Sequence, residues 1–396
     1  MKFKQEANSK NVGVMCSLIL LSFGAHCVLR GIVLPAIKDD FQMNYTEVSM
    51  LVSISMIGYF IMATLSTKLS ALIGQKTSMS VFAVGLSVSA FAIVVSHHFA
   101  LTAVMFFLAG CSYGGIEATG TAIVRRHNPR EPDLAVNNTY SFYSVGSCFI
   151  AVLGGYFLWK GYGWRAAFAF VGILSAIASL YSFTVTEKAS SASAPKASFS
   201  ELRFLIKDPV LVVMCLATAL LSGAEASSIN WMNTFLYQTV EEMNIFETSC
   251  TTALFFASIY VGRLVISKLL EHYRSITLSI VFSILSGLTV LAISYVGEAL
   301  SILICISLFG FFVSCLYPLL ASITNGLSTR GIVYSFSFGM ISLFNFLTNN
   351  CMGILADALG LRSTFRFCAI LYLIVAGLVL ACRRTVIARG GPANAT

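Results

Sequence analysis

Twelve long, nearly uninterrupted apolar stretches limit what this chain can fold into. A helix needs about 20 apolar residues to cross a bilayer core, and only helices or closed barrels satisfy their backbone hydrogen bonds there. The stretches are continuous rather than alternating, which excludes a barrel. We therefore expect an all-α integral membrane protein with twelve transmembrane helices, at 12–36, 47–69, 77–96, 100–124, 136–158, 165–186, 209–238, 246–269, 275–296, 299–322, 332–356 and 364–382.

The composition fits a chain that lies in lipid. Charged residues make up 11% and hydrophobic residues 57% of the sequence, whereas a soluble domain carries about 25% charged residues. The 11 cysteines form no CxxC pair or metal-spaced cluster, and no phosphate-binding glycine loop or Ser/His/Asp arrangement is present. We expect no metal, no cofactor, no enzymatic activity and no nucleic-acid partner.

The basic residues predict the orientation of the chain. With the N-terminus in the cytoplasm, 19 of the 25 Lys and Arg residues fall on the cytoplasmic side and 5 fall outside. Cytoplasmic connectors carry such an excess. The first apolar stretch is too long for the core of a cleavable signal peptide. Both termini are therefore expected in the cytoplasm.

The chain divides into two similar halves. We expect an N-terminal six-helix bundle at 1–186, a cytoplasmic linker rich in Ser, Ala and Lys at 187–208, and a C-terminal six-helix bundle at 209–396. Gly163-Trp-Arg165 opens the sixth span and Gly360-Leu-Arg362 opens the twelfth. Paired halves of this kind are typical of transporters that bind substrate at mid-membrane.

Glu117 lies deep inside the fourth span. At 1.5 Å per residue it lies about 24 Å from the outer end of that span. A charged side chain costs about 2.5–3.5 kcal/mol at the centre of a membrane helix, so it usually faces a cavity. Glu117 is the candidate proton-coupling residue, and a permanently protonated structural glutamate is the alternative.

Arg30 is the basic residue that lies well inside a span. It sits about 8 Å below the outer end of the first helix, from where it could snorkel outward or line a cavity. His26, one turn away on the same face, favours a polar wall. Both are candidate substrate-binding residues.

The seventh span carries Glu225 among small and polar residues, a pattern typical of a helix that unwinds or bends around a ligand. Trp231 could stack against a sugar face, and Asn230 could bind hydroxyl groups. A place in the interfacial aromatic belt is the other explanation for Trp231.

Further amides and aromatics complete the candidate substrate site. Asparagines inside a membrane helix need polar partners, which a cavity wall or an interhelix contact can provide. Capping is the alternative for amides at the start of the fifth span. These candidates are Asn137, Tyr140, Tyr317, Asn345 and Asn349.

Several segments resemble the major facilitator superfamily, and within it the fucose–galactose–glucose proton-symporter branch. The resemblance implies that Glu117 couples protons or binds substrate. This sequence departs from the family pattern at two positions. The family's first-helix aspartate falls on Gly31, beside Arg30, and its seventh-helix glutamine falls on Glu225. A guanidinium pairs bidentately with carboxylates and phosphates, so fucose is a poor fit and an acidic substrate a better one. The matching segments are Val33-Leu34-Pro35, Gly115-Ile116-Glu117-Ala118-Thr119, Ser144-Val145-Gly146, Gly223-Ala224-Glu225, Tyr317-Pro318 and Asp357-Ala358-Leu359-Gly360.

The sequence thus predicts a secondary active transporter of a sugar or sugar-like molecule, which could be acidic, driven by protons through alternating access. We expect a monomer in the lipid bilayer of a bacterial inner membrane. Two alternatives stay open: an exporter of an anionic metabolite, metal chelator or drugs, and a receptor or scaffold built on a transporter fold.

Overall fold

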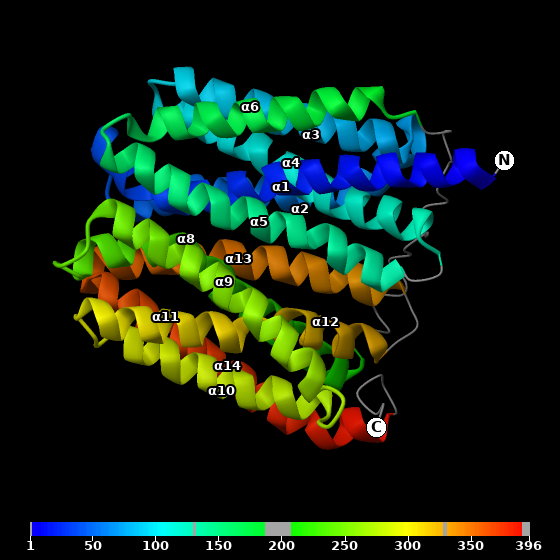
Figure 1. Ribbon diagram of the computed structural model, residues 1–396. Coiled ribbons are helices and arrows are strands. Elements are labelled where there is room, and N and C mark those ends of the chain that lie inside the picture. The colour runs from blue at the N-terminus through cyan, green and yellow to red at the C-terminus, as the bar shows by residue number, and fades with distance from the viewer. Residues whose placement is uncertain (1, 130–131, 187–206, 328–330, 390–396) are drawn as a thin grey trace. The chain divides into compact units, whose positions relative to one another are not determined.

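The computed structural model describes residues 2–129, 132–186, 207–327 and 331–389, which are almost wholly α-helical (Figure 1). The N-terminal half of this part contains α1 (Lys2–Asp40), α2 (Tyr45–Ile73), α3 (Gln75–Val95), α4 (Phe99–His127), α5 (Pro132–Trp159) and α6 (Gly163–Thr184). The C-terminal half contains α8 (Pro209–Thr239), α9 (Ile245–Leu269), α10 (Ser275–Ile293), α11 (Ala299–Val313), α12 (Leu316–Gly326), α13 (Gly331–Leu359) and α14 (Leu361–Ala388).

Within the described residues, the helices supply twelve segments that are long and apolar enough to cross a membrane, which confirms the twelve predicted spans. The tenth span, Ala299–Gly326, consists of α11 and α12. It breaks just before Tyr317 and Pro318, where proline cannot continue the hydrogen bonding of a preceding turn. In contrast, α8 is one continuous helix. The expected unwinding of the seventh span is therefore not observed.

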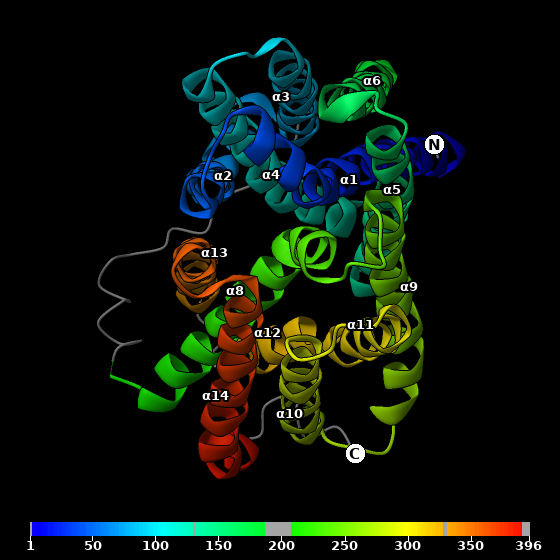
Figure 2. The same ribbon diagram turned by 90° about the vertical axis from the view of Figure 1, so that its left-hand side faces the viewer.

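The helices group into two compact units. Unit 1 comprises Met1–Met43 and Met50–Ala194, and unit 2 comprises Asn44–Ser49 and Pro195–Thr396. Within unit 1, α1 packs against α4, α5 and α6. Within unit 2, α8 packs against both α13 and α14 (Figure 2). Of the predicted linker, 187–206 lie outside the described residues.

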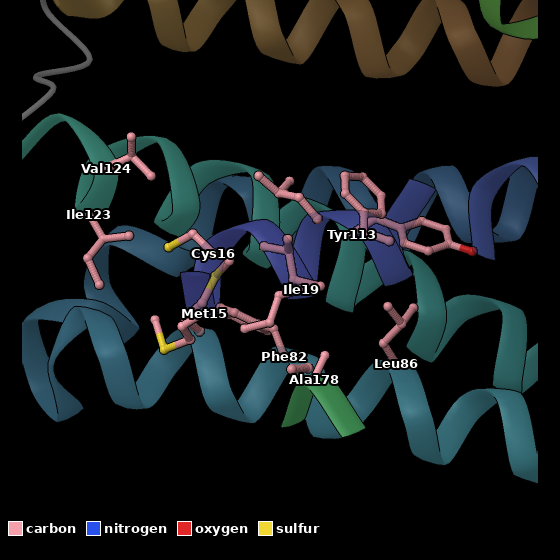
Figure 3. Close-up of a cluster of buried hydrophobic side chains, with 14 of the residues drawn as sticks. Met15, Cys16, Ile19, Phe82, Leu86, Tyr113, Ile123, Val124 and Ala178 are labelled. Atoms are coloured by element: carbon pink, nitrogen blue, oxygen red, sulfur yellow. The ribbon is translucent and has the colours of Figure 1, made fainter. Parts of the chain in front are cut away.

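An apolar core joins four helices of unit 1. Side chains from α1, α3, α4 and α6 meet in it (Figure 3). Because lipid tails are as apolar as these side chains, close packing rather than exclusion of water holds membrane helices together. The labelled residues are Met15, Cys16, Ile19, Phe82, Leu86, Tyr113, Ile123, Val124 and Ala178.

The second span of each half of the chain, α2 and α9, begins with the same cap. At α2, the backbone N–H of Asn44 donates to the Glu47 carboxylate at 2.9 Å, and the backbone N–H of Glu47 donates to Oδ1 of Asn44 at 2.8 Å. Asn244 and Glu247 form the same capping box at α9. Each pair satisfies backbone donors that the first helical turn leaves free.

The repeated glycine–arginine motif has one structural role in both units. Gly163 and Gly360 have φ angles of 81° and 80°, which glycine adopts without strain. Two residues later, Arg165 donates to a backbone carbonyl that follows α3, and Arg362 donates to one that follows α10. The motif therefore ties the start of one helix to the end of another within each unit.

Candidate functional site

Glu117 is held from α2 by a hydrogen bond to its side chain. The hydroxyl group of Tyr59 donates to Oε2 of Glu117 at 2.9 Å. The Glu117 side chain is half-buried on α4. A carboxyl group with a phenol partner inside a membrane helix can exist with or without its proton, because the phenol can donate to the carboxylate or accept from the acid.

Glycines allow α2 to approach α4 closely enough for this bond. A Cβ atom on Gly110 would lie 1.9 Å from the carbonyl oxygen of Ser55, and one on Gly114 would lie 2.2 Å from the carbonyl oxygen of Tyr59. No side chain fits at those distances, and small residues are what let membrane helices touch. The two glycines fix the register that places Tyr59 beside Glu117.

The fifth span contacts the same turn of α4. The hydroxyl group of Tyr140 donates to the backbone carbonyl of Glu117 at 3.1 Å and lies 2.9 Å from Oγ1 of Thr121. Since α5 begins at Pro132, Tyr140 lies well inside the helix, and so does Asn138. Capping does not explain them. The side chain of Asn137 lies outside the described residues.

Arg30 points into unit 1. Its side chain is only 4% exposed, its Nη1 donates to Oγ of Ser55 at 2.6 Å, and its guanidinium carbon lies 5.8 Å from the centre of the Tyr113 ring. An outward snorkel is incompatible with this placement.

His26 joins the same cluster. Its Nδ1 lies 2.6 Å from the hydroxyl group of Tyr113, and its ring contacts Phe168 edge-on. The other ring nitrogen, Nε2, is buried without a hydrogen-bond partner. Tyr113 therefore links the two predicted residues of α1 to α4, four residues before Glu117. The cluster places a permanent cation, an imidazole and a carboxyl group within one unit.

Glu225 lies in unit 2, half-buried on α8. It interacts electrostatically with Arg263 of α9, whose Nε donates to the backbone carbonyl of Ser314 at 3.3 Å. That carbonyl lies in the break between α11 and α12. The acidic residue of the seventh span is thus associated with the interruption of the tenth.

Trp231 is completely buried, which excludes the interfacial belt. Its Nε1 donates to Oδ1 of Asn349 at 3.1 Å, and Nδ2 of Asn349 donates to the backbone carbonyl of Ser49 at 2.9 Å. The first bond connects α8 to α13, and the second connects α13 to the first turns of α2, which belong to unit 2. The nearby Asn233 also contacts protein groups, with Ser249 as a 2.9 Å acceptor.

The remaining predicted residues of unit 2 differ in burial. Asn230 is 5% exposed. Tyr317 is half-buried in the first turn of α12. Oδ1 of Asn345 is buried and has no hydrogen-bond partner, so this amide can still accept a bond from a ligand.

Sequence reasoning did not identify Tyr59, Ser55 or Tyr113 as partners of the charged residues. The spacing of Gly110 and Gly114, four residues apart on α4, was the available signal, because it marks a face that another helix approaches closely.

The described residues contain no group of three or more His, Cys, Asp or Glu side chains that could hold a metal ion. What unit 1 offers instead is a set of ionisable side chains with hydroxyl and aromatic partners. This arrangement can bind a small polar molecule or a proton.

Comparisons with known proteins agree with this architecture. The chain is 23% identical over 359 residues to a "Protein TsgA homolog" from Buchnera aphidicola, an alignment that covers 89% of this chain and 90% of that one. The fold is similar to that of a bacterial homologue of the lysosomal transporter Spinster, with a TM-score of 0.80, 13% identity and coverage of 96% and 98% of the two chains. It is also similar to the Escherichia coli fucose:proton symporter, with a TM-score of 0.66, 17% identity and coverage of 94% and 98%.

Twelve apolar helices with polar side chains buried among them define the class of integral membrane transporters. Residues 14–347 match the Major Facilitator Superfamily, and the chain belongs to that family.

Proposed function

We propose that this chain is a proton-coupled secondary transporter of a small polar solute, a sugar or sugar-like molecule that can bear an acidic group. The observation that carries the proposal is the carboxyl group of Glu117 in a membrane helix, bonded to Tyr59. An ionisable group inside a membrane helix is energetically costly. Binding and release of the coupled proton would explain why the helix carries one. The transporter works by alternating access.

The ionisable side chains of Arg30, His26 and Glu225 would bind substrate groups of opposite charge. The guanidinium of Arg30 is a permanent cation that lies buried in unit 1 and donates to Oγ of Ser55. In unit 2, Asn345 and Tyr317 would add neutral contacts. Tyr140, Asn137, Asn230, Trp231 and Asn349 are proposed to complete the substrate site, with Trp231 and Asn349 orienting each other.

The proposal includes orientation and setting. Both termini would lie in the cytoplasm, and the protein would act as a monomer in a bacterial inner membrane. The charge distribution of the connectors supports the orientation.

Purified protein screened by thermal shift against sugars, sugar acids, organic acids and chelators identifies the ligand class. A ligand that binds the native state raises the Tm. We expect the stabilising compounds to lose their effect in Arg30→Ala. Uptake into proteoliposomes then tests coupling: we expect it to follow an imposed pH gradient, and indifference to that gradient in both wild type and Glu117→Gln contradicts the proposal.

Export of an anionic metabolite, chelator or drug is the second candidate. The inward placement of Arg30 favours an anion, while direction depends on the gradients. A deletion strain that accumulates the compound inside the cell supports export, and one that no longer grows on the compound supports import.

A further inference from the structure

The Tyr59 side chain contacts the titrating group of the proposed transport cycle from a different helix. We propose that Tyr59 is a positioning residue that sets the proton affinity of Glu117, and that the glycine contacts between α2 and α4 hold it in place. This inference rests on the proposed function, in which Glu117 takes up and releases the coupled proton.

The position of Tyr59 is fixed through its main chain. Its carbonyl oxygen lies 2.2 Å from the place that a Cβ atom of Gly114 would occupy. In the same way, a Cβ atom on Gly58 would lie 2.3 Å from the carbonyl oxygen of Phe107. The two helices therefore interlock from both sides. This close packing holds the main chain of Tyr59 against α4, with the phenol oxygen 2.9 Å from Oε2 of Glu117.

The chemistry of the bond depends on the proton. A phenol O–H donates to an ionised carboxylate, and a charge-assisted bond of this kind is about twice as strong as a neutral one. Once Glu117 is protonated, the bond is between two neutral groups and loses this charge assistance, whether the phenol donates to the acid or accepts from it. The Tyr59 hydroxyl thus favours the ionised form and opposes the cost of a charge in an apolar surrounding.

Other groups face Glu117 from the helices packed on α4. Cys27 of α1 and Tyr143 of α5 lie within electrostatic range of the carboxyl group, and Arg30 lies one turn further along α1. Tyr140 bonds the backbone of Glu117 rather than its carboxylate. From α3, the ring of Phe82 lies against Gly115. Tyr143 thus provides a matched control, a tyrosine near Glu117 with a ring packed edge-on against Phe23.

The test is a pH titration of the Glu117 carboxyl band by infrared difference spectroscopy, on the full chain in liposomes without substrate. Subtracting spectra of Glu117→Gln assigns the band. We expect Tyr59→Phe to move the midpoint to higher pH by about one unit, a tenfold gain in proton affinity. Tyr143→Phe removes no hydrogen bond to the Glu117 carboxylate and is expected to move the midpoint by much less. An unchanged midpoint in Tyr59→Phe overturns the inference.

A nearly isosteric replacement keeps the test valid if Tyr59→Phe does not fold. Fluorotyrosine at position 59 is a stronger donor than tyrosine, so we expect it to move the midpoint to lower pH. An upward shift or no shift overturns the inference. Proton-driven uptake lost in Glu117→Gln, with no shift in either Tyr59 variant, rejects the role of Tyr59 and retains the proposed function. Midpoint shifts in both Tyr59 variants without proton-driven uptake support the role of Tyr59 and reject the proposed function.

Discussion

Arg362 donates from Nη1 to the carbonyl oxygen of Ser294 at 3.1 Å, and so closes the C-terminal end of α10 from the second residue of α14. Arg165 does the same for Ser96 in unit 1, also at 3.1 Å.

A charged donor on a helix-end carbonyl contributes about 1.5–3 kcal/mol. We predict that Arg362→Ala lowers the free energy of unfolding by about that amount, measured by thermal unfolding in detergent. The exposed Lys160 is the control, since Lys160→Ala should leave the Tm within error. Equal Tm values for all three proteins would show that the clamp contributes nothing.

Gly114→Ala tests the contact between α2 and α4. The new methyl group would lie 2.2 Å from the carbonyl oxygen of Tyr59, so one helix must move. Overpacking of this kind costs about 1–3 kcal/mol. We expect a lower Tm and a Glu117 titration midpoint at higher pH, because Tyr59 moves away from Glu117 with α2. Gly13→Ala, where nothing lies within 4 Å, should be neutral or slightly stabilising. Equal Tm values for Gly114→Ala and Gly13→Ala would show that the close approach of α2 to α4 does not limit the size of residue 114.

We predict that Asp208, at the start of α8, makes a pH-dependent contribution to the stability of the protein. Its Oδ1 accepts from the backbone N–H groups of Val210 and Leu211 at 3.2 and 3.3 Å, and its Oδ2 accepts from Arg389. The hydrogen bond from Arg389 holds the pKa of Asp208 below its ordinary value.

A lowered folded-state pKa stabilises the protein above the unfolded value of about 3.9, and this stabilisation is lost as the pH falls through the lowered one. Loss of an N-cap costs about 1 kcal/mol. Asp208→Ala should therefore lower the Tm at pH 7, and the difference should shrink below about pH 4. A difference independent of pH would assign the effect to packing.

Trp231→Phe separates a structural from a ligand-binding role. Phenylalanine keeps an aromatic ring but leaves Oδ1 of Asn349 without its 3.1 Å donor. We expect the unliganded protein to lose about 1–2 kcal/mol of stability. Trp159→Phe, at an exposed indole, should have no such effect. A Trp231→Phe protein with wild-type Tm and weakened ligand binding would show that the indole serves the substrate instead.

The topology could be predicted from sequence because lipid imposes a simple rule. Twelve continuous apolar stretches had to be helices, because no other open structure satisfies its backbone hydrogen bonds in lipid. The continuous course of α8 was not predictable, because small and polar residues around Glu225 are compatible with both a bent and a straight helix.

The charged residues of the site could also be identified, since Arg30, Glu117 and Glu225 are costly in a membrane. Their partners could not. Tyrosine and serine carry little cost in a membrane helix, so Tyr59 and Ser55 gave no signal of their own. The direction of Arg30 was undecided by depth alone, and the 2.6 Å bond to Ser55 settles it.

The most direct test of the central claim measures proton movement with substrate. Proteoliposomes containing a pH-sensitive dye would receive the compound that most raises the Tm of the purified protein. Proton coupling through Glu117 predicts that adding the compound outside acidifies the lumen in wild type, and that Glu117→Gln gives no pH change. Uptake of the compound with no change in lumenal pH, at equal rates in both proteins, would contradict it.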